Sequence, residues 1–174
     1  MSKENSKLIT SVSLGLALMG AISFLPPVNV ACAQAMQATS AFAGLSGKWS
    51  GDGSIVLPNG STERLRCDAA YEVGGGGDNL DQTLQCVSDS YNFDLRVNLE
   101  DNGGAIVGSW NEVTKSVAGG ISGQGAKGLI RVVVSGQNLA ANVVVKTQGN
   151  KQAVSIRSQS GDLAQVTITL HRVR

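Results

Sequence analysis

Few residues in this chain have the chemistry of a catalytic or metal site. The sequence holds 174 residues and a single histidine, His171, which excludes a site built from several histidines of one chain. A serine triad would need this imidazole beside a serine and a carboxylate. The alternation of the last segment places His171 on the face opposite Val166 and Ile168, so we predict an outward, solvated side chain.

Other matches to functional motifs lack the context that their chemistry needs. Residues 123–128 fit the G-x-G-x-x-G pattern, but a dinucleotide site requires a helix after it, and the β-branched run 130–134 follows here. The carboxylates form no spaced pair of the kind that hydrolyses glycosides. Residues 101–103 contain too few oxygen ligands for calcium. We therefore expect no catalytic residue, no metal and no cofactor, and we expect that the chain is not an enzyme.

Two cysteines are expected to pair in a disulfide. Four glycines, residues 74–77, separate two alternating segments, and folding a hairpin about its midpoint pairs residues whose numbers sum to 153. This register places Cys67 opposite Cys86 and Ala69 opposite Leu84, so that the apolar faces of the two strands coincide. We predict a structural Cys67–Cys86 disulfide, which suits an oxidising compartment.

The N-terminal residues 1–35 have the three parts of a secretory signal peptide. A basic start precedes the uncharged stretch 8–25, and small-residue A-x-A patterns allow cleavage after Ala33 or Ala35. An uncleaved membrane anchor is the first alternative, since the uncharged stretch approaches the length of about 20 residues that spans a bilayer. A lipidated Cys32 is the second alternative. We predict cleavage, a periplasmic or secreted protein, and no stable membrane insertion of the mature chain.

The charge balance argues against electrostatic partners. The chain carries 14 Lys and Arg against 13 Asp and Glu, a net charge of +1. Binding of nucleic acid draws on an excess of basic residues, so we expect no nucleic-acid partner. The sequence leaves the oligomeric state open.

The chain after the leader alternates between apolar and polar residues in short segments separated by Gly, Asn, Asp and Ser. This pattern predicts an all-β fold, an antiparallel up-and-down meander of about eight to ten strands. A closed barrel is favoured over a two-sheet sandwich because closure removes exposed strand edges. We expect a linker over 36–46 and a single β-barrel domain over 47–174.

Residues at the two ends of this domain resemble the lipocalins and their calycin relatives. Gly47-Lys48-Trp49 is similar to the G-x-W signature that opens the first strand in that superfamily. The resemblance implies that Trp49 closes one end of the barrel and that Arg172, near the end of the last strand, packs across it. An arginine over an indole face contributes about 0.5–2 kcal/mol.

Two functional hypotheses follow from an exported barrel. The first is a non-catalytic protein that binds a small apolar ligand in its interior, with Tyr71, Phe93 and Trp110 as lining residues. The second is an envelope structural or protein-interaction module, or an inhibitor, with a filled barrel that acts through its surface. A hollow interior favours the first hypothesis, and a filled interior with an apolar outer patch favours the second.

Overall fold

The computed structural model describes residues 40–174 apart from 138 and 161–163. These residues form ten β-strands and confirm the predicted all-β fold. The strands are β1 (Gly47–Val56), β2 (Thr62–Gly74), β3 (Asn79–Val87), β4 (Asn92–Asn102), β5 (Ala105–Glu112), β6 (Val117–Ala126), β7 (Leu129–Gly136), β8 (Leu139–Gln148), β9 (Lys151–Ser160) and β10 (Gln165–Arg172). The predicted signal peptide 1–35, including Cys32 and both cleavage positions, lies outside the described residues, as does the start of the expected linker.

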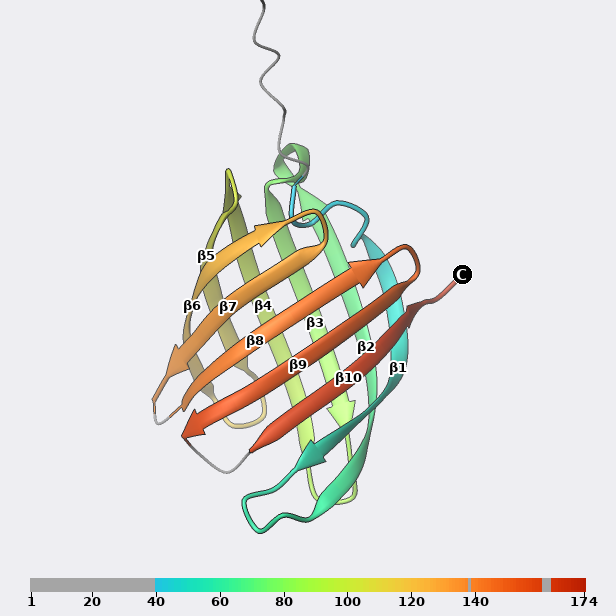
Figure 1. The fold of residues 1–174 in the computed structure, drawn as a ribbon, viewed down its shortest axis with the longest axis vertical. Coiled ribbons are helices and arrows are strands. Elements are labelled where there is room, and N and C mark those ends of the chain that lie inside the picture. The colour runs from blue at the N-terminus through green and yellow to red at the C-terminus, as the bar shows by residue number, and fades with distance from the viewer. Residues whose placement is uncertain (1–39, 138, 161–163) are drawn as a thin grey trace, which may run out of the picture. The chain divides into compact units, whose positions relative to one another are not determined.

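The strands form a closed barrel rather than a sandwich. Each strand pairs antiparallel with the next along the chain, and β10 returns to pair with β1 (Figure 1). In that last pairing Trp49 lies opposite Arg172 and Ile55 lies opposite Val166. The predicted up-and-down meander and its closure are therefore confirmed. Closure gives every strand a partner on both sides, which leaves no unpaired edge.

The β2–β3 hairpin has the predicted register. Cys67 lies opposite Cys86 and Ala69 opposite Leu84, and a disulfide joins the two cysteines. Both cysteines belong to the buried core. Between the strands, residues 75–77 form the 3-10 turn η1, in which all three glycines have positive φ angles that side-chain-bearing residues rarely adopt. Among the described residues no helix is long and apolar enough to cross a membrane.

The two ends of the barrel are built differently. The turn η1 and the tight turns at 103–104, 127–128 and 149–150 lie at one end, together with residues 40–46 before β1. This end, called the closed end below, is at the top of Figure 1. The connections after β1, β3 and β5, together with the last residues of β7 and β9, lie at the opposite end, called the open end.

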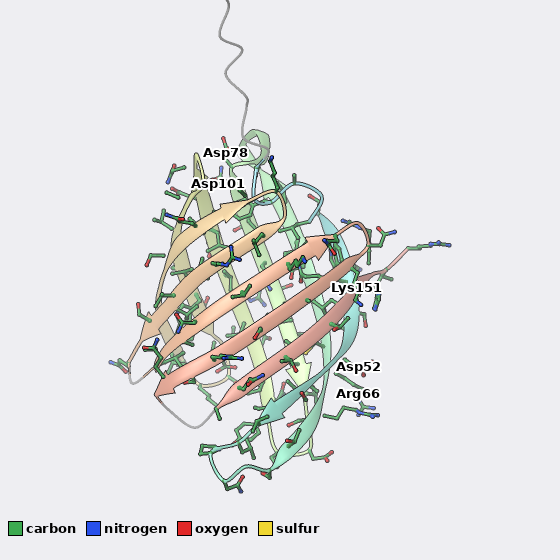
Figure 2. All side chains as sticks on the ribbon, viewed as in Figure 1. Asp52, Arg66, Asp78, Asp101 and Lys151 are labelled. Atoms are coloured by element: carbon green, nitrogen blue, oxygen red, sulfur yellow. A yellow bond between two sulfur atoms is a disulfide. The ribbon has the colours of Figure 1, made fainter. Side chains whose placement is uncertain are left out.

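Residues 40–45 belong to the core of the closed end. They form a turn in which the Leu45 N–H donates to the Phe42 carbonyl, and Ala41, Phe42 and Leu45 are almost fully buried. The side chain of Asp101 accepts a hydrogen bond of 2.8 Å from the Ala41 N–H and so fastens this turn to the end of β4. Figure 2 shows Asp101 and Asp78 beside each other at this end, where the Asp101 N–H donates to the Asp78 carbonyl. The expected linker over 36–46 thus includes residues that pack into the barrel, because their apolar side chains cover an end that strands alone leave uncovered.

Candidate ligand-binding cavity

The interior of the barrel contains a cavity of about 570 Å³. Volumes of roughly 300–1,000 Å³ are typical of small-molecule sites. Inward-facing side chains of β2 to β10 line it, and most of them are aliphatic. They include Leu80, Leu84, Leu95, Val97, Leu99, Val117, Ile121, Ile130, Val132, Val134, Leu139, Val143, Val145, Val154, Ile156, Val166, Ile168 and Leu170. A filled interior, which the interaction-module hypothesis expects, is not what these side chains produce.

Several inward-facing aliphatic side chains are only partly buried although they point into the barrel. Val97, Val143 and Ile156 are of intermediate exposure, while Ile55 and Leu65 on the β1–β2 side are almost fully buried. The difference arises because the first group faces the cavity and the second group packs directly against other side chains. Apolar walls without a packing partner lose dispersion contacts that an apolar ligand would restore.

Trp110 on β5 forms part of the cavity wall and is held by its neighbours. Its indole Nε1–H donates a hydrogen bond of 3.1 Å to the Ser135 carbonyl on β7. The side chain crosses Gly119 and Gly136, where an added Cβ would come within 2.7 Å and 2.8 Å of the indole. Glycine at these two positions makes room for the ring, so the sequence provides a fixed aromatic wall.

One group of polar side chains inside the barrel, toward its closed end, is joined by hydrogen bonds. The Tyr71 hydroxyl donates a hydrogen bond of 2.6 Å to Gln152 Oε1, and Gln152 Nε2 donates to the Thr147 hydroxyl at 3.2 Å. Burial raises the pKa of Tyr71 well above its ordinary value, although the hydrogen bond to Gln152 opposes the shift. The tyrosine is therefore neutral at physiological pH. Gln82, which also lines the cavity, donates a weaker bond of 3.4 Å to the same hydroxyl.

Aromatic side chains and a lysine stand at the open end. The rings of Tyr91 and Phe93 stack with centroids 5.8 Å apart, and the Lys115 ammonium lies 5.8 Å and 5.7 Å from their respective centroids. Cation–π attraction acts at distances up to about 6 Å. Phe93 and Lys115 also line the cavity. The lysine therefore lies at the boundary between the apolar interior and solvent.

The loop that carries Tyr91 is fixed by Glu63. This carboxylate accepts a 2.7 Å hydrogen bond from the Ser88 hydroxyl and a 3.1 Å hydrogen bond from the Ser90 N–H. Hydrogen bonds from Ser90 and Ser88 lower the pKa of Glu63 below its ordinary value of 4.5. The Ser88 hydroxyl in turn accepts a hydrogen bond from the Tyr91 N–H, so the backbone that carries the Tyr91 ring is held in an ordered turn.

Glu112 performs a similar function for the loop that carries Lys115. Its Oε2 accepts a hydrogen bond of 2.5 Å from the Lys115 N–H, and its Oε1 accepts bonds from the Asp94 N–H and the Thr114 hydroxyl. Burial by itself would raise the pKa of Glu112, but the bonds from Thr114, Asp94 and Lys115 outweigh it and lower the pKa below 4.5. Glu112 is thus an ionised, buried carboxylate whose oxygens are engaged within the protein.

The closed end contains the residues on which the lipocalin resemblance rests. The Arg172 guanidinium lies 4.5 Å from the centre of the Trp49 ring and donates hydrogen bonds to the carbonyl oxygens of Gly44 and Ser46. The Trp49 Nε1–H donates a bond of 2.8 Å to the Leu45 carbonyl. Both side chains therefore bind the chain segment that precedes β1.

The structure gathers only some of the residues singled out in the sequence. Tyr71, Phe93 and Trp110 all line the cavity, whereas Trp49 and Arg172 do not. His171 is exposed on the outer face, as its strand parity predicts, and lies opposite Ser50 on β1.

Two further cavity residues, Glu112 and Lys115, were not predicted from the sequence. The even-numbered alternation of Ile106, Gly108 and Trp110 extends to Glu112 and could have revealed that its side chain points inward, but Lys115 lies in a turn with no periodicity to follow.

Comparison with known proteins supports the fold. No family model and no curated protein matches the chain. Among solved structures, Rv2717c from M. tuberculosis matches with a TM-score of 0.62 at 15% identity, over 77% of this chain and 96% of that one. The S-type phycobiliprotein lyase CPES from Guillardia theta matches with a TM-score of 0.52 at 14% identity, over 74% of this chain and 88% of that one. The lipocalin-like resemblance is therefore supported at the level of the barrel fold.

The second of these structures corrects one expectation. We expected that the chain is not an enzyme because it lacks recognisable catalytic motifs, yet a protein named as a lyase has a similar barrel. The expectation was wrong because triads, metal clusters and carboxylate pairs are not the only routes to catalysis: a fold that encloses its ligand can position reactants without any of these. Absence of a motif in this sequence therefore does not exclude catalysis.

Proposed function

We propose that this protein is an exported β-barrel that binds a small, predominantly apolar molecule in its interior. The observation that carries the proposal is the cavity of about 570 Å³ with aliphatic and aromatic walls. Burial of apolar surface contributes about 25 cal/mol per Å², so transfer of an apolar molecule from water into this space is favourable. The leader pattern of residues 1–35 and the buried Cys67–Cys86 disulfide support an oxidising, exported location.

Two adjacent valines allow a direct test of where the ligand binds. Val143 lines the cavity, while the next residue, Val144, is exposed on the outer face. Val143→Phe would fill part of the cavity, and Val144→Phe would add the same atoms outside. The probe is N-phenyl-1-naphthylamine, an uncharged apolar dye that becomes fluorescent in apolar surroundings. We expect the unmodified protein and Val144→Phe to bind it equally and Val143→Phe to bind it at least tenfold more weakly. Equal binding by all three proteins would contradict the proposal.

The two tryptophans provide a second readout. Only Trp49 and Trp110 are present in the chain, and only Trp110 lines the cavity. Bound 1-bromododecane, whose bromine quenches an indole only at close range, should strongly quench the emission of Trp110 in Trp49→Phe and should change the emission of Trp49 in Trp110→Phe little. Both variants should first be shown to unfold cooperatively, because both indoles are buried.

The natural ligand and the location can be examined in one preparation. Native mass spectrometry of the mature protein, purified from its own exported compartment, should show an adduct of small-molecule mass that is lost on denaturation. The mass of the denatured chain reports cleavage after Ala33 or Ala35. The released molecule should then be incubated with fresh protein and its mass measured again, because a change would indicate conversion rather than binding alone. A full-length mass would contradict cleavage.

A further inference from the structure

One positively charged side chain, Lys115, lines the cavity at its open end. Two charged residues line the cavity, Glu112 and Lys115. The Lys115 side chain is exposed, and its ammonium contacts the rings of Tyr91 and Phe93. Within the part of the chain that the structure describes, it forms no ion pair with a carboxylate.

The nearby carboxylate does not neutralise this site. Glu112 has 4% exposure, and its two oxygens accept hydrogen bonds from two backbone N–H groups and one hydroxyl. The oxygens of Glu112 are thus engaged by β4 and by the turn that follows β5, and a ligand could bind them only by replacing those hydrogen bonds. The ammonium of Lys115, by contrast, needs no rearrangement to meet a ligand.

From this arrangement we infer that the preferred ligand is an amphipathic molecule with a single anionic group, which binds Lys115 at the open end while the apolar part occupies the cavity. The inference rests on the proposed function, since it concerns the same cavity. Such a ligand has a carboxylate, sulfate or phosphate group joined to an apolar chain or ring system. Gln137 and Gln165 line the cavity at the same end and supply amide groups that can donate hydrogen bonds to such an anion.

The contacts of Lys115 also favour an anion over a neutral group. The Lys115 ammonium lies over the stacked rings at the cavity's edge, so one side of this exposed charge faces aromatic rings rather than water. An ion pair contributes more where protein replaces part of the water around the charge than it does on an open surface. A preference of about three- to tenfold for an anion over a neutral molecule of the same chain length is expected, since tenfold corresponds to about 1.4 kcal/mol.

Three ligands that differ only in the head group test this preference. Dodecanoate, dodecan-1-ol and dodecylamine are used to displace N-phenyl-1-naphthylamine from the mature protein at neutral pH. We expect dodecanoate to displace the dye at about three- to tenfold lower concentration than the alcohol, and the amine to be the weakest of the three. Raising the salt concentration should weaken dodecanoate and leave the alcohol unchanged.

Variants of Lys115 identify the responsible charge. In Lys115→Met, dodecanoate and dodecan-1-ol should displace the dye at similar concentrations, and Lys115→Arg should keep the preference for dodecanoate. The matched control is Lys151→Met, which removes the same charge at the closed end, where Figure 2 labels this residue. Lys151→Met should keep the preference for dodecanoate, because it lowers the net charge by the same amount without changing the cavity.

The outcomes separate the two proposals. If dodecan-1-ol binds but dodecanoate binds no better, or if the preference survives in Lys115→Met, the inference about the anion is overturned and the apolar cavity stands. If neither the dye nor the alcohol binds to a folded protein, the proposed function fails and the inference fails with it.

Discussion

The two ends of the barrel use aromatic and basic residues for different purposes. At the closed end, Arg172 covers Trp49 and donates to the carbonyl oxygens of the segment before β1, and Phe42 is fully buried. At the open end, Lys115 covers Tyr91 and Phe93, but these side chains border a cavity and solvent. A similar pairing of cation and aromatic ring thus stabilises the fold at one end and leaves a binding surface at the other. The difference depends on whether a chain segment packs over the ring.

The largest effect is expected at the closed end, from Phe42→Ala. Truncation of a fully buried phenylalanine costs about 3–5 kcal/mol in the free energy of unfolding, because it removes apolar contacts and leaves a void. Urea denaturation of the mature protein measures the change. Phe93→Ala is the control at the open end and should cost less, because Phe93 is only partly buried. Equal losses for the two variants would remove the distinction between the ends.

The disulfide should rank second. The Cys67–Cys86 bond closes a loop with a sequence separation of 19 residues, and a loop of this size stabilises by about 3 kcal/mol in the chain-entropy model. Denaturation of the Cys67→Ala/Cys86→Ala double variant should show this loss. Dye binding should persist under native conditions because neither cysteine lines the cavity. Free thiols in the exported protein, detected by mass after alkylation without reductant, would contradict the bond.

Loss of the Arg172 side chain should have an intermediate effect. Arg172→Ala removes the contact with Trp49 and the bonds to the Gly44 and Ser46 carbonyl oxygens, so we expect a destabilisation of about 1–3 kcal/mol. Affinity for the apolar dye should not change. A variant that loses dye binding but keeps its stability would place the ligand site at the closed end instead.

The smallest effect on stability is expected at the open end, from Glu112→Gln at acidic pH. The lowered pKa of Glu112 means that its ionised form is favoured by folding, so this contribution is fully present above the unfolded pKa near 4.5 and is lost as the pH falls through the lower, folded pKa. Glu112→Gln should reduce stability at pH 7 and flatten the dependence of stability on pH below 4.5. Unfolding midpoints measured from pH 7 to pH 3 test this. An unchanged pH dependence would show that the carboxylate does not order the Lys115 turn.

Much of the architecture follows from local patterns in the sequence. Alternation of apolar and polar residues indicated the strands, and short polar turns between them indicated an antiparallel meander, since neighbouring strands in the chain pair with each other. The β2–β3 register could be predicted because a shift by a single residue would turn the inward-facing apolar side chains of one strand toward solvent. The same register brought Cys67 and Cys86 together.

Residues outside the strands were harder to place. Phe42 and Leu45 precede the first strand and have no period of their own, so only the packed structure reveals them as the cover of the closed end. Lys115 belongs to a turn, and its position over Tyr91 and Phe93 depends on two loops separated by the whole of β4 and β5. The leader and its cleavage remain predictions from the sequence pattern.

The sequence by itself determined the strands, their order and the face that each side chain presents, because these depend on local periodicity and on the register of adjacent segments. Tertiary structure alone decided whether the barrel is hollow and which end is covered. Those properties depend on the volumes of side chains from nine strands that meet across the interior, and on the packing of residues 40–46 over Trp49. The alternation within a single strand therefore cannot predict the volume of the interior or the cover at the closed end.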